Sequence, residues 1–198
     1  ALLLAILMPT LSAAREQAKA VICMSNLRQV HLLHQLYIER YDGFMVPGNV
    51  RDLNIRIWPA LLSDTSVWSD FSPYLYCASR PIMHKYATMY GLNVHSFQGE
   101  DSLVRVTQLE HPTMTILNAD TANQFEREPF NYNNWSYKLR CLSLEGVIHG
   151  SPPWFRHKEK ANILFTDGHV EARVEDEVER DMLNYMWMYK DFWGGAYF

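Results

Sequence analysis

The sequence predicts an α+β fold in which a long N-terminal helix packs on a small antiparallel β-sheet. The first observation is a helical pattern of apolar residues that extends from the start of the chain to Tyr41. The second is the frequency of proline beyond that point, which favours short strands and loops over long helices. The third is a pair of extended segments on either side of Asp167 and Gly168, which predicts a β-hairpin. A helix laid across such a sheet is an α+β arrangement.

The composition is that of a folded protein with one well-buried domain. The chain has 198 residues, of which 48% are hydrophobic and 13% aromatic. It can therefore bury enough apolar surface to offset its conformational entropy. Because 18 Lys and Arg face 22 Asp and Glu, the net charge is −4. The lack of a basic excess argues against a nucleic-acid partner.

The first residues of the chain are strongly apolar. Nine of the first eleven residues are apolar, and no charge precedes Arg15. A membrane-spanning helix needs about 20 apolar residues, and the basic start and cleavage site of a secretory signal are not visible. We therefore expect a longer apolar helix of which this is the distal half, with further residues before Ala1. The apolar front comprises Leu2, Leu3, Leu4, Ile6, Leu7, Met8, Pro9 and Leu11.

We expect the helix to continue past Pro9 to Tyr41. Proline removes one backbone donor and favours a kink, but the residues from 12 to 19 are rich in strong helix formers. Asp42 and Gly43 then supply a stop signal. The stripe at intervals of three and four, predicted to pack the helix on the head, contains Ala20, Cys23, Leu27, Val30, His34, Tyr37 and Tyr41. The expected domains are the helix, 1–42, and a globular head, 43–198.

The head should consist of short elements. We predict a short helix within 58–68, strands over 89–94 and 113–118, and a loop-like segment over 120–151. The strongest local signal is a hairpin over 161–174. In it, Asp167 and Gly168 should form a two-residue primed turn, with positive φ at both positions.

The last fourteen residues carry seven aromatic side chains. A chain terminus normally frays, so this much apolar surface should be buried against the head or against a neighbouring molecule. We favour contact with another subunit, and packing on the chain's own head is the alternative. The residues concerned are Tyr185, Trp187, Tyr189, Phe192, Trp193, Tyr197 and Phe198.

Three segments together resemble a bacterial protein family. They are Leu3-Leu-Ala-Ile-Leu-Met-Pro9-Thr-Leu, Cys23-Met-Ser-Asn-Leu-Arg-Gln29, and His157 followed after nine residues by Asp167-Gly168. In this order they resemble the prepilin-like proteins with an H-x9-D-G signature, which are similar to type II secretion pseudopilins and type IV pilins. The resemblance implies a pilin-like fold and a leader that is cleaved and N-methylated by a prepilin peptidase. It also implies an inner-membrane anchor and extraction by an assembly machinery.

We therefore expect a structural protein, a subunit of an extracellular type IV pilus-like or pseudopilus filament whose partners are copies of itself. The apolar front would form the filament core. No catalytic triad or phosphate-binding glycine loop stands out, so we expect no enzymatic activity. The alternative function is a membrane-anchored or filament-tip binding protein, in which Trp135 and Trp154 contact polysaccharide or secreted cargo.

The signature residues invite a catalytic or metal-binding interpretation, but we predict structural roles for them. Asp167 and Gly168 are explained by the turn. His157 should lie at or before the start of the first hairpin strand and hydrogen bond to a neighbouring loop. His31 and His34 are three residues apart on the helix and could start a metal site, but no acidic or cysteine partner is close in sequence.

Calcium is a possibility that the resemblance raises, because related pseudopilins often carry it in a C-terminal loop. The loop carboxylates Asp101, Asp120 and Glu126 could contribute ligands, but no D-x-D-x-D spacing is present. We therefore predict no metal ion and no cofactor.

The chain contains an odd number of cysteines, namely Cys23, Cys77 and Cys141. In an extracytoplasmic protein two of them could pair. Cys23 lies on the inward stripe of the helix and Cys77 follows an apolar run, so this pair is our first choice for a disulfide. We nevertheless favour free, buried thiols that behave as small hydrophobic groups over any disulfide.

Overall fold

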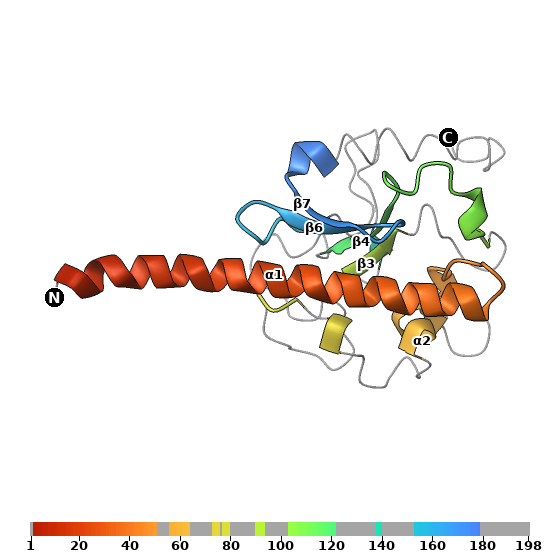
Figure 1. The fold of residues 1–198 in the computed structure, drawn as a ribbon, viewed down its shortest axis with the longest axis horizontal. Coiled ribbons are helices and arrows are strands. Elements are labelled where there is room, and N and C mark those ends of the chain that lie inside the picture. The colour runs from red at the N-terminus through yellow and green to blue at the C-terminus, as the bar shows by residue number, and fades with distance from the viewer. Residues whose placement is uncertain are drawn as a thin grey trace.

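The computed structural model describes residues 2–50, 56–63, 73–75, 77–79, 90–93, 103–121, 138–139 and 153–178. Within these ranges a long helix lies along a small β-sheet, so the predicted α+β class is correct (Figure 1). The helices are α1 (Leu2–Arg40), α2 (Trp58–Ser63) and the 3-10 helices η1 (Pro73–Leu75) and η3 (Val106–Gln108). The strands are β1 (Asn49–Val50), β2 (Arg56–Ile57), β3 (Tyr90–Asn93), β4 (Ile116–Asp120), β5 (Lys138–Leu139), β6 (Ala161–Phe165) and β7 (Val170–Arg173).

Helix α1 is continuous through Pro9, as the sequence predicts. It stops where expected, because Asp42 and Gly43 adopt positive φ angles of 52° and 82°. The Gly43 N–H donates to the carbonyl of Ile38 at 2.9 Å, which closes the last turn. Arg105 then holds this end by donating to the carbonyl oxygen of Asp42 at 2.7 Å and to its carboxylate at 2.9 Å.

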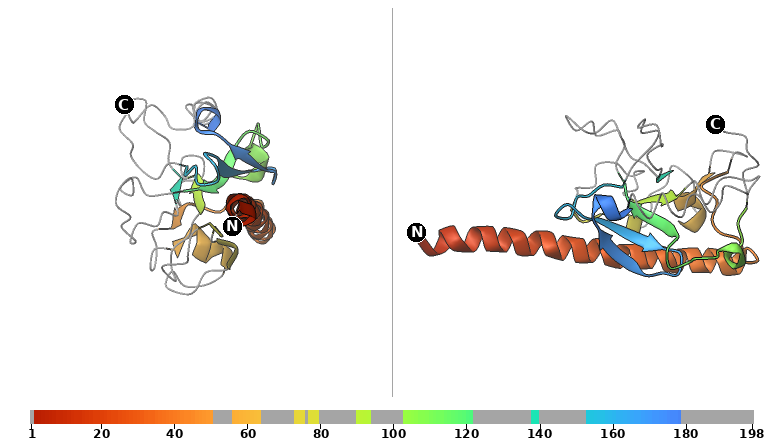
Figure 2. Two further views of the ribbon diagram at one scale, coloured as in Figure 1. Left: turned by 90° about the vertical axis from the view of Figure 1, so that its left-hand side faces the viewer. Right: turned by 90° about the horizontal axis from the view of Figure 1, so that it is seen from above.

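The two halves of α1 have different surroundings. Its first part projects beyond the head, whereas its second part lies along the sheet, with α2 on the other side (Figures 1 and 2). The buried residues of the second part are Cys23, Leu27, Val30, His34 and Ile38.

The inward stripe departs from the prediction at its end. Tyr37 is half-buried, but Tyr41 is 46% exposed, so the prediction that Tyr41 packs on the head is wrong. The helical path ends at Arg40, and Ile38 takes the last inward position instead. The Tyr41 ring stacks on that of Tyr37, with 4.2 Å between centroids.

The main sheet has the order β5-β3-β4-β6-β7. The pairs β3–β4, β4–β6 and β6–β7 are antiparallel, as predicted, whereas β5 pairs in parallel with β3. A separate two-stranded ribbon joins β1 and β2. Strand β4 begins later than the predicted 113–118, because Met114 and Thr115 donate to the carbonyl of His111 and thereby form a turn.

Both faces of the sheet are covered by apolar side chains. The face toward α1 contributes Leu92, Leu117 and Leu164 to a core shared with the inward side of the helix and with Trp58 of α2. A smaller cluster on the opposite face contains Ile116, Ala119, Ala161, Ile163, Phe165 and Val178. Strands β3, β4 and β6 are therefore a buried layer that positions α1 on one side.

The predicted hairpin is present as β6 and β7, but its turn differs from the prediction. Only Gly168 has a positive φ, 96°, and its N–H donates to the carbonyl of Phe165 at 3.0 Å. The loop therefore has three residues, 166–168, with glycine in the left-handed position, so the predicted two-residue primed turn is wrong. The Asp167 carboxylate instead accepts a hydrogen bond from the backbone N–H of His169 at 3.1 Å.

Candidate functional site

The side of α1 that faces away from the head carries a second row of apolar residues. We call it the outer stripe; it comprises Leu7, Leu11, Val21, Ile22, Leu32 and Leu36. Each of these side chains is between 49% and 62% exposed. With about 3.6 residues per turn, they lie on one side of the helix, roughly opposite the buried Leu27 and His34.

The outer stripe begins on the projecting end and continues along the part that packs on the head. Exposed alanines, Ala14 and Ala18, occupy the same side between Leu11 and Val21. No helix within the described ranges combines the length and apolar content that crossing a membrane requires. Exposed Ser25 and Gln29 interrupt the row on the same side between Ile22 and Leu32. Exposed apolar surface of this kind is typical of interaction sites. The inward stripe was predicted from the sequence but the outer stripe was not, although the spacing of Leu32 and Leu36 could have indicated it.

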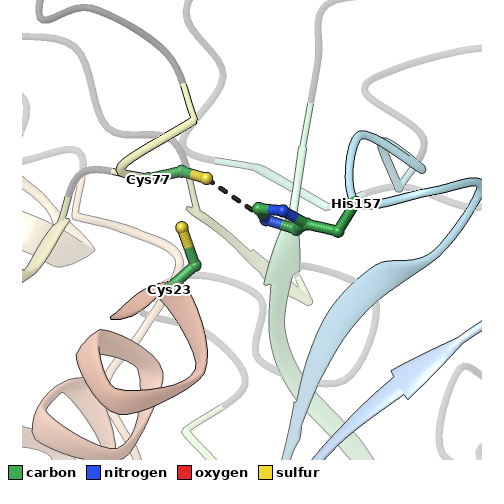
Figure 3. A group of neighbouring side chains, drawn as sticks. All are labelled: Cys23, Cys77 and His157. Atoms are coloured by element: carbon green, nitrogen blue, oxygen red, sulfur yellow. Dashed lines mark hydrogen bonds between the residues drawn. The ribbon is translucent and has the colours of Figure 1, made fainter. Parts of the chain in front are cut away.

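A second feature is a buried group of thiol and imidazole side chains between α1 and the head (Figure 3). The Sγ atoms of Cys23 and Cys77 and a ring nitrogen of His157 all lie within 4.8 Å of one another. The Cys77 Sγ is 3.3 Å from His157 Nε2, and Asp120 Oδ2 is 3.4 Å from the same nitrogen. We call these four residues the thiol–imidazole cluster. All four are buried.

Four separate segments contribute to the cluster. Cys23 comes from the inward side of α1, Cys77 from the turn after η1, Asp120 from the end of β4, and His157 from the turn before β6. The order of strands brings the last two together, because β4 and β6 are neighbours in the sheet.

A tight turn sets the direction of His157. Its N–H donates to the carbonyl of Lys160 at 3.0 Å, and the Lys160 N–H donates back at 3.2 Å. The two residues between them, Lys158 and Glu159, both have positive φ, 53° and 62°. Non-glycine residues adopt this conformation at a cost. The primed turn therefore lies directly after His157, at the start of the H-x9-D-G signature, and not at Asp167. Its two central residues are neither glycine nor asparagine, so the sequence does not indicate it.

Backbone and side-chain groups surround the cluster with further hydrogen bonds. The Ala78 N–H donates to Cys23 Sγ at 3.0 Å. Ser79 Oγ lies 3.3 Å from His157 Nδ1, and the Asn162 N–H donates to Asp120 Oδ2 at 3.0 Å. The other carboxylate oxygen of Asp120, Oδ1, is buried and has no hydrogen-bond partner among the described residues.

The cluster shifts the pKa values of its members in different directions. A hydrogen bond from Cys77 lowers the pKa of the Cys23 thiol, although burial opposes this. The same hydrogen bond, together with burial, raises the pKa of Cys77. Burial alone would lower the pKa of His157, but the contacts with Asp120 and Cys77 outweigh it and raise that pKa to about 9. Cys23 is therefore the more acidic thiol of the pair.

The structure brings together the cysteines that we chose as the candidate disulfide, but as free thiols. The third cysteine, Cys141, lies outside the described residues. His157 lies four residues before β6, where the sequence places it, and contacts the turn that contains Cys77 and Ser79.

The two helix histidines are used for packing. His34 is fully buried, its Nε2 lies 3.0 Å from Asn118 Oδ1, and its ring is stacked 6.0 Å from that of Trp58. Burial lowers its pKa to about 3, so the ring stays neutral. His31 faces Gly168, where an added Cβ would lie 2.5 Å from its Nε2. Neither histidine lies in a metal-binding group among the described residues.

The remaining predicted residues divide into two groups. The ring of Trp154 is covered on one face by the guanidinium of Arg156, 4.1 Å from its centroid, so that face is closed to a ligand. Asp120, one of the calcium candidates, is buried in the cluster. The other candidates lie outside the described residues: Asp101, Glu126, Trp135 and the aromatic segment 185–198.

No family model, no curated protein and no solved structure matches this chain.

Proposed function

We propose that the protein is a structural subunit that polymerises through helix α1 into a helical filament outside the cell. The observation that carries this proposal is the outer stripe, an exposed apolar row that extends from the projecting end along the side away from the head. A helix that is apolar on two opposite sides needs a second apolar partner in addition to its own head.

Neighbouring copies of the chain are suitable partners. Projecting helices can pack side by side in a bundle, with their apolar parts inward and the heads outside. A repeated contact that does not close on itself generates a filament. The resemblance to prepilin-like H-x9-D-G proteins supports the same function. Processing by a prepilin peptidase, an inner-membrane stage and a role in a type II secretion or type IV pilus system are part of this proposal.

A pair of lysine substitutions tests the role of the outer stripe. Leu11→Lys places a charge in the stripe on the projecting end, while Gln17→Lys places one on another side of the same exposed segment. Neither residue is packed in the isolated subunit, so both variants should fold normally. In a filament, Leu11→Lys loses the burial of an apolar side chain, about 1.5–3 kcal/mol, and adds the cost of a buried charge.

Electron microscopy after removal of detergent is the assay. Wild type and Gln17→Lys should form uniform filaments, with a subunit rise of order 10 Å, whereas Leu11→Lys should remain unassembled. Filaments of Leu11→Lys equal to those of wild type would refute the role of the stripe. Persistent monomers of the wild-type chain would overturn the proposal and favour the alternative, an anchored or filament-tip binding protein. In a separate arm, normal assembly after deletion of 185–198 would reject an interface role for the tail.

A further inference from the structure

The thiol–imidazole cluster is not used by the proposed filament contacts, and it joins the helix to three segments of the head. Cys23 belongs to the helix, and Cys77, Asp120 and His157 belong to the head. All four side chains are buried, with Asp120 fully so. Two thiols, an imidazole and a carboxylate are a ligand set that suits zinc better than calcium or magnesium, which prefer oxygen ligands.

We propose that Cys23, Cys77, His157 and Asp120 bind one zinc ion, which fastens helix α1 to the head. Four protein ligands and complete burial are typical of a closed, structural zinc site. The proposal departs from the sequence-based expectation of no metal, because the ligands come from four segments with no recognisable spacing. It does not depend on whether the chain forms filaments.

The distances fit a tetrahedral site. With Zn–S of about 2.3 Å, Zn–N of about 2.05 Å and Zn–O of about 2.0 Å, neighbouring ligand atoms lie about 3.5 Å apart for S and N and about 3.3 Å for N and O. Cys77 Sγ to His157 Nε2 is 3.3 Å, and that nitrogen to Asp120 Oδ2 is 3.4 Å. These are two edges of the expected tetrahedron. Cys23 Sγ lies within 4.8 Å of the other sulfur and of the His157 ligand nitrogen. Asp120 contacts that nitrogen but lies outside this mutually close group, so a four-ligand site requires its carboxylate and Cys23 Sγ to move toward a shared centre.

The charges also balance. Two thiolates and the Asp120 carboxylate supply three negative charges, and zinc supplies two positive ones. The guanidinium of Arg156, whose Nε lies 3.9 Å from Asp120 Oδ1, supplies the third. A site that is neutral overall can be buried at low cost, whereas an uncompensated charge cannot.

Hydrogen-bonding groups around the cluster orient the side chains that would bind zinc. Ser79 Oγ contacts His157 Nδ1 and so directs Nε2 toward the sulfurs. The Ala78 N–H donates to Cys23 Sγ, and the Asn162 N–H donates to Asp120 Oδ2. A disulfide between Cys23 and Cys77 would account for the two sulfurs alone. Zinc also accounts for the imidazole beside Cys77 and for the carboxylate that contacts the same imidazole nitrogen.

Metal loading of the full chain tests the proposal. The reduced protein, exposed to zinc chloride in mild detergent and then desalted, should retain one zinc ion per chain by elemental analysis. Cobalt(II) in place of zinc should give a strong thiolate-to-cobalt absorption in the near ultraviolet and the visible bands of tetrahedral cobalt. Absence of both signals in reduced, folded wild-type protein would overturn the proposal.

Variants separate ligands from residues that only pack. Cys77→Ser should lose zinc and the cobalt absorption, whereas Cys141→Ser should keep both. His157→Phe should lose zinc, and His157→Cys should restore it with a stronger thiolate band. Ser79→Ala should weaken zinc binding by roughly 10–100-fold in competition with a chromogenic chelator. Equal zinc retention by Cys77→Ser and wild type would refute the assignment.

The oxidation state of the Cys23 and Cys77 thiols provides a third test of the zinc site. After unfolding in the presence of a chelator, which exposes the buried thiols, both Cys23 and Cys77 of the zinc-loaded protein should react with a maleimide, as reduced cysteines do. A cross-linked peptide joining the two cysteines in protein purified without reductant, lighter by two hydrogen atoms, would show that a disulfide occupies the site and would overturn the proposal.

Discussion

Replacing Gly168 by alanine tests how the H-x9-D-G signature joins the hairpin to the helix. Gly168 ends the turn between β6 and β7 with φ of 96°, and it lies directly against the ring of His31 on α1. An added Cβ would lie 2.5 Å from Nε2, 2.7 Å from Cδ2 and 3.0 Å from Cε1 of that ring. The substitution therefore meets two obstacles, one in the backbone and one in packing.

The two obstacles have separable magnitudes. A left-handed backbone conformation costs an L-residue about 1–2 kcal/mol. Overpacking adds about 1–3 kcal/mol, at the lower end here because the half-buried ring of His31 can rotate away. We expect Gly168→Ala to reduce the free energy of unfolding by about 2–4 kcal/mol.

A double-mutant cycle with His31→Ala isolates the packing part, with urea unfolding followed by far-ultraviolet circular dichroism as the assay. In the His31→Ala background the cost of Gly168→Ala should fall to the backbone part, about 1–2 kcal/mol. A cost below about 0.5 kcal/mol in the wild-type background, which is the scale of neutral surface changes, would refute the reasoning on both counts. If Gly168→Ala lowers the free energy of unfolding equally in both backgrounds, the added methyl group does not clash with the His31 ring.

Two further predictions concern histidine protonation and backbone strain. Because the folded pKa of His34 is lowered to about 3 from 6.5, its neutral form stabilises the fold fully above pH 6.5. This contribution is lost as the pH falls, by about 1.4 kcal/mol per pH unit between 6.5 and 3. Urea titrations across this range should show that slope in wild type and lack it in His34→Leu; equal slopes would contradict the prediction. Glu159→Gly should raise the free energy of unfolding by about 0.5–1 kcal/mol, because glycine adopts positive φ without strain. The control is Lys160→Gly, at a neighbouring exposed position without positive φ, which should not stabilise the protein. Thermal unfolding compares the two variants. Equal changes in stability would exclude backbone strain at Glu159 as the cause.

The local features of the fold were predictable because short-range chemistry determines them. Strong helix formers after Pro9 and the Asp42-Gly43 stop define α1, and two extended segments on either side of Asp167 and Gly168 define β6 and β7. The turn between these strands was placed correctly but assigned the wrong type. Its conformation depends on a single residue, Gly168, and on hydrogen bonds from Thr166 and Asp167 to the carbonyl of Pro112 in a distant loop.

The candidate site was only partly predictable. Cys23 and Cys77 could be paired on the ground that both belong to apolar segments, and the structure does place them together. His157 was expected near the start of a strand, but nothing near it in sequence indicates that it meets Asp120. That contact exists because β4 and β6 are neighbours in the sheet, although about 40 residues separate them in sequence.

The sequence by itself determined the long helix, its inward stripe, the hairpin and the α+β class, because periodicity and turn chemistry act over a few residues. The tertiary structure decided the sheet order, the cluster of four residues from four segments, and which apolar side of the helix remains exposed. Leu32 and Leu36 are as apolar as Leu27, and only the packing of the head against one side of α1 leaves them free for a partner. Burial depends on where distant segments come together, and no local pattern contains that information.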